Sequence, residues 1–533
     1  MASAPKPGKT VGIDLGTTRS TLAHLDEHGK ATVIPSADSE LVTPSVVLID
    51  EDNVIIVGGD AKNQSVAAGS RVIRESKRDI GRTDATWEID GETYTPEMIG
   101  SMILRKLKQD AEAKLSEPVV NAVITVPAYF DDSQRAATEA AGGLARLNVI
   151  GILSEPVAAA LAYGLDRQRE DGHVVVYDLG GGTFDVTVMK VTSGEITMVA
   201  TDGNVELGGK DWDDRIIKRI SEQFLQEHGV DPLEDVDTCQ QLKNDAESAK
   251  ESLTSKEKTR IIVQHQGHKL VYNLTRAEFD ELTEDLLAQT EATVTEVVED
   301  QAGLSWANVN QVLLVGGSSK MPQVATMLRE LTGKDVTVGD PEPDLCVALG
   351  AAYYGTIVEA QQASDRGSEM APEKRKEVEE RIAALPPAQR DALTSTKVTM
   401  VTSHAYGIEV VDERGQEINE IMIARNASLP AVETRDFGLV RDGQTGVDIV
   451  VWEGESTDRK FCQKAGEGKI SGFPPSPAGT PVAVKMEFTS EGVIKVRAEC
   501  QGKSFEGTFE RPQGMSSAEQ QAAGKLLATK KVE

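Results

Sequence analysis

The chain has 533 residues, a formal net charge of −30 at pH 7, 39% hydrophobic residues and 4% aromatic residues. This length predicts several domains, and the acidity argues against direct binding to nucleic acids or anionic membranes, which are themselves polyanions. No apolar run approaches membrane-spanning length, and residues 1–9 lack the apolar core of a signal peptide, so a disordered arm is expected there. The four cysteines show no metal-ligand or CxxC spacing, which favours free thiols in a reducing compartment such as the cytoplasm.

Residues 11–25 have the pattern of a hairpin with a polar tip. An apolar strand reaches Asp14, the chain passes through Gly16, Thr17 and Thr18, and apolar alternation then resumes.

A basic cluster at 70–82 follows predicted strands over 34–49 and 54–59 and stands out in an acidic chain. A lysine or arginine of this cluster can reach a bound phosphate or an attacking water. For any one of these residues taken alone, a solvated helix face is the simpler explanation.

The next predicted elements are a helix over 98–113, a buried strand over 119–129 that turns at Pro127, and an alanine-rich helix over 131–145. Glu155 then stands where a strand passes into another helix. A carboxylate at such a junction can line a cleft and hold a water, or it can simply favour the positive end of the helix dipole.

Residues 174–190 predict a second hairpin, with three glycines at 180–182. Glycines let the backbone approach a phosphate and direct its N–H groups inward as an anion nest. Asp178 and Asp185 flank the nest, which makes sense if a hydrated Mg²⁺ lies between them and the phosphates. For three glycines alone, an ordinary glycine-rich hairpin with solvated aspartates is the favoured interpretation.

The two hairpins repeat each other, because Asp-Leu-Gly at 14–16 recurs at 178–180. Repetition on this scale predicts two similar lobes that each give one phosphate hairpin to a shared cleft. A cleft with two such hairpins suits a nucleoside triphosphate.

Six segments, in this order along the chain, resemble the seventy-kilodalton heat-shock chaperone family. They are GIDLGTT (12–18), VITVPAYF (123–130), EPVAAALAYGLD (155–166), YDLGGGTFDV (177–186), ELGGKDWDDR (206–215) and LLVGGSSKMP (313–322). The resemblance covers 10–357 strongly and 398–511 more weakly. It implies an α/β, actin-like, two-lobed ATPase domain over 10–357 that binds ATP or ADP with Mg²⁺, with K⁺ as a further candidate ion.

The resemblance also implies roles for single residues. Catalytic roles fall on Lys77, on Glu155, which would position the attacking water, and on Asp178, Thr183 and Asp185. Nucleotide contacts are implied for a larger set: Asp14, Gly16, Thr17, Thr18, Gly180, Gly181, Gly182, Thr183, Gly208, Gly209, Glu247, Lys250, Gly316, Gly317, Ser318 and Lys320. The metal would be held, mostly through water, by Asp14, Asp178 and Asp185. Glu251 and Lys320 stand where animal members place arginines that sandwich the adenine.

Residues 358–397 depart from the family, which has a short apolar linker here. The charged stretch around 373–385 has helical spacing, so a short helix in a tether and a disordered spacer are both open. The linker itself, 397–400, is more polar than in the family and is expected to dock less well on the ATPase domain. Pro127 and Arg135 match the positions that transmit nucleotide state to the second domain.

Residues 398–511 predict a β-sandwich, from short alternating strands separated by turn residues. Six residues match or adjoin the peptide-binding groove of the family: Ile408, Val411, Phe437, Val440, Val447 and Ile449. A groove of this kind binds an extended peptide through main-chain hydrogen bonds and an apolar pocket. The alternative is that these residues belong to the sandwich core.

The tail, 512–533, is long enough for one short helix and not for the helical lid of the family. Ala478 stands where bacterial members have the arginine that latches the lid. Both departures predict fast release of a bound peptide. A nucleotide-exchange factor is a candidate partner, whereas the usual J-domain contact is not expected, because 149–151 and Met400 lack the charges used there.

These features predict an ATP-dependent, lidless chaperone-like protein that is a slow ATPase and binds extended apolar segments of unfolded proteins. The alternative is a nucleotide-dependent scaffold that holds one dedicated partner. A small-molecule kinase on the same fold is disfavoured because Lys77 and Glu155 provide for water.

Overall fold

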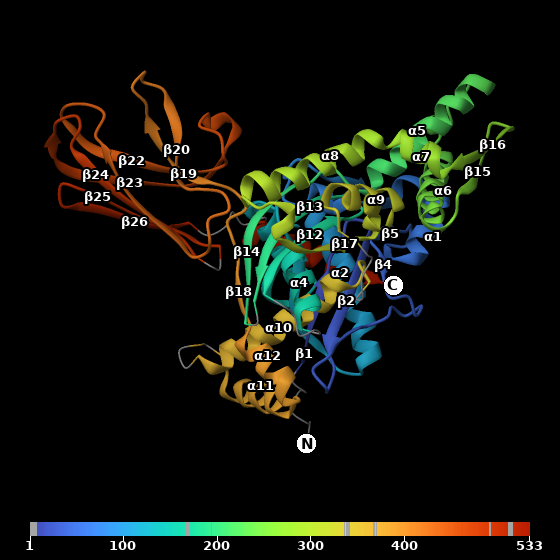
Figure 1. Ribbon diagram of the computed structural model, residues 1–533, viewed down its shortest axis with the longest axis horizontal. Coiled ribbons are helices and arrows are strands. Elements are labelled where there is room, and N and C mark those ends of the chain that lie inside the picture. Colours follow the sequence, from blue (N-terminus) through green and yellow to red (C-terminus); the bar gives the residue numbers. More distant parts are fainter. Residues whose placement is uncertain are drawn as a thin grey trace.

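The computed structural model describes residues 8–165, 171–192, 194–334, 336, 342–365, 368, 370–489, 492–509 and 515–533 (Figure 1). Most of the arm predicted for residues 1–9 lies outside these residues, and Lys9 already belongs to the first strand. Two lobes, each built on a mixed sheet with helices, are followed by a β-sandwich. This is the actin-like α/β ATPase architecture with a β-domain that the resemblance implies.

Lobe I is built around a sheet with the order β11-β10-β1-β2-β3, in which β1 is parallel to β10 and antiparallel to β2. Its strands are β1 (Lys9–Asp14), β2 (Arg19–Leu25), β3 (Ala31–Val33), β10 (Val119–Val126) and β11 (Asn148–Ser154), and β4 (Thr43–Pro44) pairs with β2. Helices α2 (Pro96–Leu115) and α3 (Asp132–Leu144) pack on it. Thr95 caps α2, and Asp131 forms a capping box with Gln134 at the start of α3.

A smaller sheet in lobe I has the order β27-β6-β5-β7. Its strands are β5 (Val46–Ile49), β6 (Val54–Val57), β7 (Val72–Arg74) and β27 (Lys531–Val532), and helix α1 (Gly59–Ala68) lies against it. The short 3₁₀ helix η2 (Ser76–Asp79) follows β7. The hairpin of β8 (Trp87–Ile89) and β9 (Glu92–Tyr94) leads to α2.

Lobe II is built around a sheet with the order β17-β12-β13-β14-β18. Its strands are β12 (Gly172–Leu179), β13 (Phe184–Val191), β14 (Glu195–Asn204), β17 (Val309–Val315) and β18 (Lys397–Thr399). As in lobe I, an antiparallel hairpin has a parallel strand beside its first arm, here β17 beside β12. The predicted internal repeat is therefore visible as one strand arrangement used twice.

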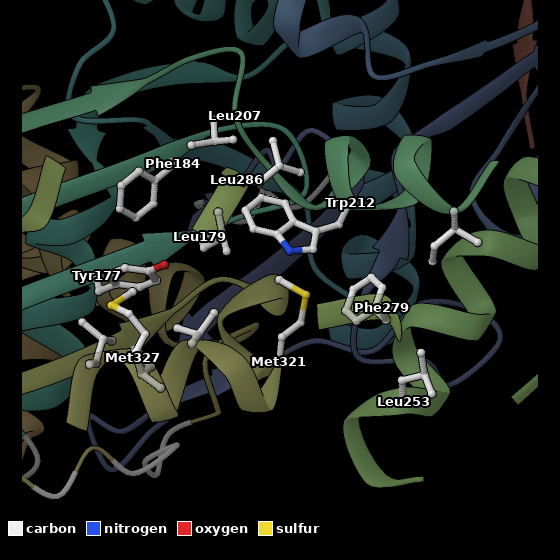
Figure 2. Close-up of a cluster of buried hydrophobic side chains, with 14 of the residues drawn as sticks. Tyr177, Leu179, Phe184, Leu207, Trp212, Leu253, Phe279, Leu286, Met321 and Met327 are labelled. Carbon is white, nitrogen blue, oxygen red and sulfur yellow. The ribbon is translucent and has the colours of Figure 1, made fainter. Parts of the chain in front are cut away.

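The remaining elements of lobe II are α5 (Gly209–His228), α6 (Val236–Ser255), the hairpin of β15 (Lys258–His265) and β16 (His268–Thr275), α7 (Arg276–Leu282), α8 (Glu284–Thr295) and α9 (Pro322–Thr332). Side chains from the sheet, such as Tyr177 and Phe184, and from the helices, such as Trp212 and Phe279, gather in one buried cluster (Figure 2). This cluster fixes the position of the β12–β13 hairpin against α5.

Helices α4 (Glu155–Leu165) and α10 (Cys346–Ser364) lie between the two sheets. Their common core includes Val123 and Leu153 of lobe I together with Val176 and Leu313 of lobe II. The two lobes therefore meet through packed helices, and the tips of their hairpins face the same space.

The segment 358–397 is folded where the structure describes it. Helix α10 continues to Ser364, and α11 (Pro372–Ala384) and α12 (Pro387–Ser395) pack against it through buried Val378, Ile382 and Leu393. Of the two alternatives left open by the sequence, helix and spacer, these residues form helices.

The polar linker docks, contrary to expectation. Residues Lys397–Thr399 form β18, which pairs in parallel with Glu195–Thr197 of β14 (Figure 1). The expectation was wrong because it was based on side-chain polarity. Strand pairing uses backbone N–H and C=O groups, which any residue other than proline supplies.

The β-domain is a sandwich of two antiparallel sheets with the orders β20-β19-β22-β23 and β21-β24-β25-β26. Its strands are β19 (Tyr406–Val411), β20 (Glu417–Ile423), β21 (Ala431–Gly438), β22 (Gln444–Glu453), β23 (Gln463–Ser476), β24 (Pro481–Phe488), β25 (Ile494–Cys500) and β26 (Lys503–Phe509). Apolar residues from both sheets form its core.

The tail returns to lobe I, which the sequence did not predict. Helix α13 (Ser517–Ala528) buries Ala523 and Leu527 in the lobe I core, and β27 pairs in parallel with β6. The buried Lys530 forms an ion pair with Glu92, and Figure 1 shows the C-terminus beside the strands of lobe I. Within the described residues, no helix combines the length and apolarity needed to cross a membrane.

Candidate functional site

A cavity of about 320 Å³ lies between the lobes. The predicted residues that line it are Asp14, Gly16, Thr17, Thr18, Lys77, Glu155, Asp178, Gly180, Gly181, Thr183, Glu247, Lys250, Gly316, Gly317, Ser318 and Lys320. Residues separated by up to three hundred positions in the sequence thus meet around one space. Asp185, Gly182, Gly208 and Gly209 are not among its lining residues.

The tips of the two phosphate hairpins touch each other. A Cβ on Gly181 would overlap the Thr18 side chain, and a Cβ on Gly182 would overlap the Thr17 side chain. The glycines are therefore required by the close approach of lobe I as well as by the nest geometry. The start of α5 supports the β12–β13 tip from behind, because Gly209 N donates to Gly180 O at 2.9 Å.

Three aspartates lie close to the two hairpin tips: Asp178 and Asp185 are buried, and Asp14 is half-buried. Asp178 and Asp185 are direct cross-strand partners on β12 and β13, and Asp14 ends β1. Burial, with the nearby Glu155 charge, raises the pKa of Asp14 to about 7 and that of Asp185 to about 8, and it raises the pKa of Asp178 as well. Like charges placed this close are stable only if protons or a cation compensate them.

These aspartates fit a hydrated divalent cation. Carboxylate oxygens are the donors that Mg²⁺ prefers, and Mg²⁺ usually keeps several of its waters. Within the described residues, no group of three or more His, Cys, Asp or Glu side chains is close enough to hold an ion directly. The donor set therefore suits an ion held through its water shell and through phosphate oxygens.

Lys77 and Glu155 form a buried ion pair, with 2.7 Å between Nζ and Oε1 and side-chain exposures of 6% and 9%. Lys77 lies in η2, and Glu155 begins α4. The solvated helix face considered for Lys77 is thus wrong, because its ammonium faces the cavity rather than solvent. This pair can neutralise phosphate charge and orient a water at the same place.

The opposite end of the cavity is lined by lobe II cations that are already paired. Lys250 Nζ lies 2.6 Å from Asp213 Oδ2, and Lys320 Nζ lies 2.5 Å from Asp344 Oδ2. Burial raises the pKa of Asp213 to about 6, although the Lys250 charge opposes this shift.

Glu247 joins the lobes on this side. Its Oε2 accepts a hydrogen bond from Lys62 of α1 at 2.7 Å and one from Arg74 of β7 at 3.2 Å.

Among the lining residues that sequence reasoning missed, three are charged: Arg19, Asp213 and Asp344. Asp213 lies four positions after Gly209, so a helix-face argument on ELGGKDWDDR had the means to find it. No local pattern marks Arg19 or Asp344. The ion-pair partner of Arg19 lies in the opposite lobe, and that of Asp344 lies in a turn distant in sequence.

The predicted interdomain residues lie at the junction with the β-domain. Arg135 donates to Ala128 O at 3.1 Å and to Ser403 Oγ at 3.3 Å, and Pro127 O accepts from Phe130 N, which closes the turn carrying Tyr129. These contacts tie the end of β10 to the segment that leads into the β-domain.

Tyr129 connects this junction to the cavity. Its backbone N donates to Asp185 Oδ1 at 3.3 Å, its ring lies 4.8 Å from the His404 ring, and the Arg425 guanidinium lies 4.9 Å from the ring centroid. Arg425 also forms a 2.8 Å ion pair with Asp202 of lobe II.

The six residues predicted for the peptide groove do not share one environment. Ile408 and Ile449 are buried in the sandwich core, and Phe437 and Val447 are partly buried against it. Val411 and Val440 are exposed, by 40% and 51%. For the two isoleucines, the alternative of a core position describes the structure.

Comparison with known proteins places nearly the whole chain in one family. The Hsp70 protein family model matches residues 10–367 and 387–530. The chain is 38% identical over 510 residues to the chaperone protein DnaK of Thermosipho africanus, and 39% identical over 511 residues to those of Thermotoga petrophila and Thermotoga maritima. Each match covers 94% of this chain and 80% of the relative. The chain therefore belongs to the Hsp70 family, whose members hydrolyse ATP.

Proposed function

We propose that the chain couples ATP hydrolysis between lobes I and II to the binding of extended apolar peptides by its β-domain. The observation that supports this best is the cavity, where two glycine-containing hairpins meet beside buried carboxylates and a buried lysine–glutamate pair. Such a set can hold a triphosphate and stabilise the charge that moves during phosphoryl transfer to water.

In the proposed reaction, the backbone N–H groups of 16–18 and 181–183 hold the phosphate oxygens of ATP. Lys77 neutralises charge on the transferred phosphoryl group, and the Glu155 carboxylate accepts a hydrogen bond from the attacking water and orients it. Thr183 lines the cavity, and its hydroxyl would donate a hydrogen bond to a phosphate oxygen. No covalent intermediate with the protein is needed.

Asp14, Asp178 and Asp185 would hold the water shell of a bound Mg²⁺. When bound, this ion supplies charge neutralisation at the phosphates. It would also remove the need for protons on the three carboxylates, whose pKa values are raised. We propose K⁺ only as a further ion at the same phosphate end.

Coupling between the domains would run through the Tyr129 turn. The turn touches the metal-shell Asp185 on one side and His404 and Arg425 of the β-domain on the other. Pro127 and Arg135 would set the geometry of this turn. A change at the phosphates would then alter the contacts that hold the β-domain in place.

The β-domain would bind an extended peptide and release it fast. Within the described residues after β26, the helix α13 lies in the core of lobe I, away from the sandwich. This placement supports the proposal that no full helical lid covers the peptide. Unfolded polypeptides and a nucleotide-exchange factor are the proposed partners, the J-domain contact is not, and the proposed location is the cytoplasm.

Steady-state ATP hydrolysis by the full chain, with and without a saturating extended apolar peptide, tests this function. We expect the peptide to stimulate hydrolysis and Lys77→Ala to abolish both the basal and the stimulated rate. A hydrolysis rate that stays the same when a peptide shown separately to bind is added would contradict the coupling. Relatives named as chaperones give no support to the alternative of a scaffold for one dedicated partner.

A further inference from the structure

Arg19 reaches across the cleft from lobe I to lobe II. Arg19 is the first residue of β2 and directly follows the tip of the lobe I phosphate hairpin. Its guanidinium forms an ion pair with Glu251 of α6, and its Nη2 lies 3.9 Å from Glu247 Oε1. A Cβ placed on Gly317 would lie 3.9 Å from Nη1. The guanidinium thus lies between the two segments of lobe II that line the cavity beyond the phosphate hairpins.

The other cations that line the cavity are committed elsewhere. Lys77 faces the phosphate end with Glu155, and the ammonium groups of Lys250 and Lys320 are held by aspartates of lobe II itself. Among the described lining residues, Arg19 is the only arginine, and it is the only cation there whose ion pair joins the two lobes.

The position and chemistry of Arg19 suit a nucleoside. If the hairpins hold the phosphates, the nucleoside must lie in the rest of the cavity, which is where this guanidinium lies. A planar, delocalised guanidinium stacks on the face of a purine better than a compact ammonium does. The ion pair with Glu251 fixes the plane in place, since a carboxylate restricts the guanidinium geometry.

We propose that Arg19 contacts the nucleoside of bound ATP or ADP, with Glu251 as its positioning residue, and that this pair slows nucleotide release. The lobes must part for the nucleotide to leave, and parting them breaks the Arg19–Glu251 contact. This inference rests on the nucleotide site proposed above. It assigns to lobe I a contact with the nucleoside end, beyond its role at the phosphates.

The test compares ADP with inorganic tripolyphosphate, which has the phosphates but no nucleoside. Titration calorimetry on the full chain should show that Arg19→Ala weakens ADP binding about tenfold. Arg19→Lys keeps the charge, so it should leave tripolyphosphate binding unchanged and still weaken ADP binding about threefold. Glu251→Gln should speed the release of ADP. In steady-state hydrolysis, Arg19→Lys should raise KM for ATP more than it lowers kcat.

Arg497→Ala is the matched control, because it removes an exposed arginine–glutamate ion pair in the β-domain. The distance between Arg497 Nη2 and Glu499 Oε1 is 2.5 Å. It should bind both ligands as the wild type does. The proposal is overturned if Arg19→Lys binds ADP as tightly as the wild type, or if it weakens ADP and tripolyphosphate equally. Failure of the wild type itself to bind ADP would instead overturn the nucleotide site.

Discussion

Glu453 should make the docking of the β-domain dependent on pH. It ends β22 with a side chain buried against lobe I, where Tyr406 OH lies 3.3 Å from Glu453 Oε1 and donates to Asp132 Oδ2 at 2.8 Å. One hydroxyl proton cannot serve two carboxylates. Burial, together with the Asp132 charge, raises the pKa of Glu453 from 4.5 to about 8. The docked state therefore holds a proton on Glu453 at neutral pH.

The sign of the effect follows from this raised pKa. Below about pH 4.5 Glu453 is protonated in both the docked and the undocked state, so the docking free energy does not depend on its titration. Between about pH 4.5 and 8 only the docked state holds the proton. In that window the docking free energy weakens by about 1.4 kcal/mol per pH unit, a tenfold change in the equilibrium constant. His404 acts in the same direction. Burial lowers its pKa, but the hydrogen bond to Glu455 and the charges of nearby carboxylates together outweigh burial and raise it, so the contribution of His404 fades as pH rises through that value.

Glu453→Gln removes the titrating group while its amide can still donate to Asp132 or Tyr406. Small-angle X-ray scattering between pH 5.5 and 8.5 measures the docked population, which should fall with pH in the wild type and fall less steeply in the variant. Glu467→Gln replaces a glutamate that is 69% exposed and should keep the wild-type slope. A flat wild-type profile between pH 6 and 8, or equal slopes in wild type and Glu453→Gln, would refute the reasoning.

Three further predictions follow from the cavity and the tail. Lys77→Ala and Thr183→Ala should each lower kcat on the order of a hundredfold while the far-ultraviolet circular dichroism of the folded chain stays unchanged, and full turnover in both would contradict the assigned site. Chelation of divalent cations should stop hydrolysis and leave the far-ultraviolet circular dichroism unchanged, because the proposed metal compensates the three cavity aspartates and is not part of the hydrophobic core; activity that survives chelation would contradict the metal assignment. Leu527→Ala, at a side chain that is 1% exposed, should lower the free energy of unfolding in urea by about 2–5 kcal/mol, whereas the exposed Lys525→Ala should not; equal stabilities would mean that the tail is not part of the lobe I core.

The phosphate hairpins could be predicted because their signal is local. Asp14 is the last residue of β1 and Asp178 the last but one of β12, each just before glycine or threonine residues, and these patterns lie within a few positions of sequence. The burial of Lys77 has no such local signal, because its neighbours in sequence indicate only a basic cluster. Its burial opposite Glu155 depends on a contact between residues 78 positions apart, which no local pattern contains.

The errors have the same physical cause. The docking of β18 rests on backbone pairing with β14, and side-chain polarity says little about backbone hydrogen bonds. The tail shows only Ala523 and Leu527 as a short apolar pair at helical spacing, which predicts a helix but not its partner. Arg19 was overlooked because its ion-pair partner lies 232 positions away.

Lobe I draws its core from both ends of the chain, since Val11 and Val532 belong to the same buried cluster. A ribosome delivers the chain from the N-terminus onward, so lobe II and the β-domain can close while this cluster still lacks Leu527 and its neighbours. Contacts of such long sequence separation form slowly, because a large loop must be closed before they bring any gain. Lobe I is therefore the first part of the chain to be synthesised and the last to complete its folding.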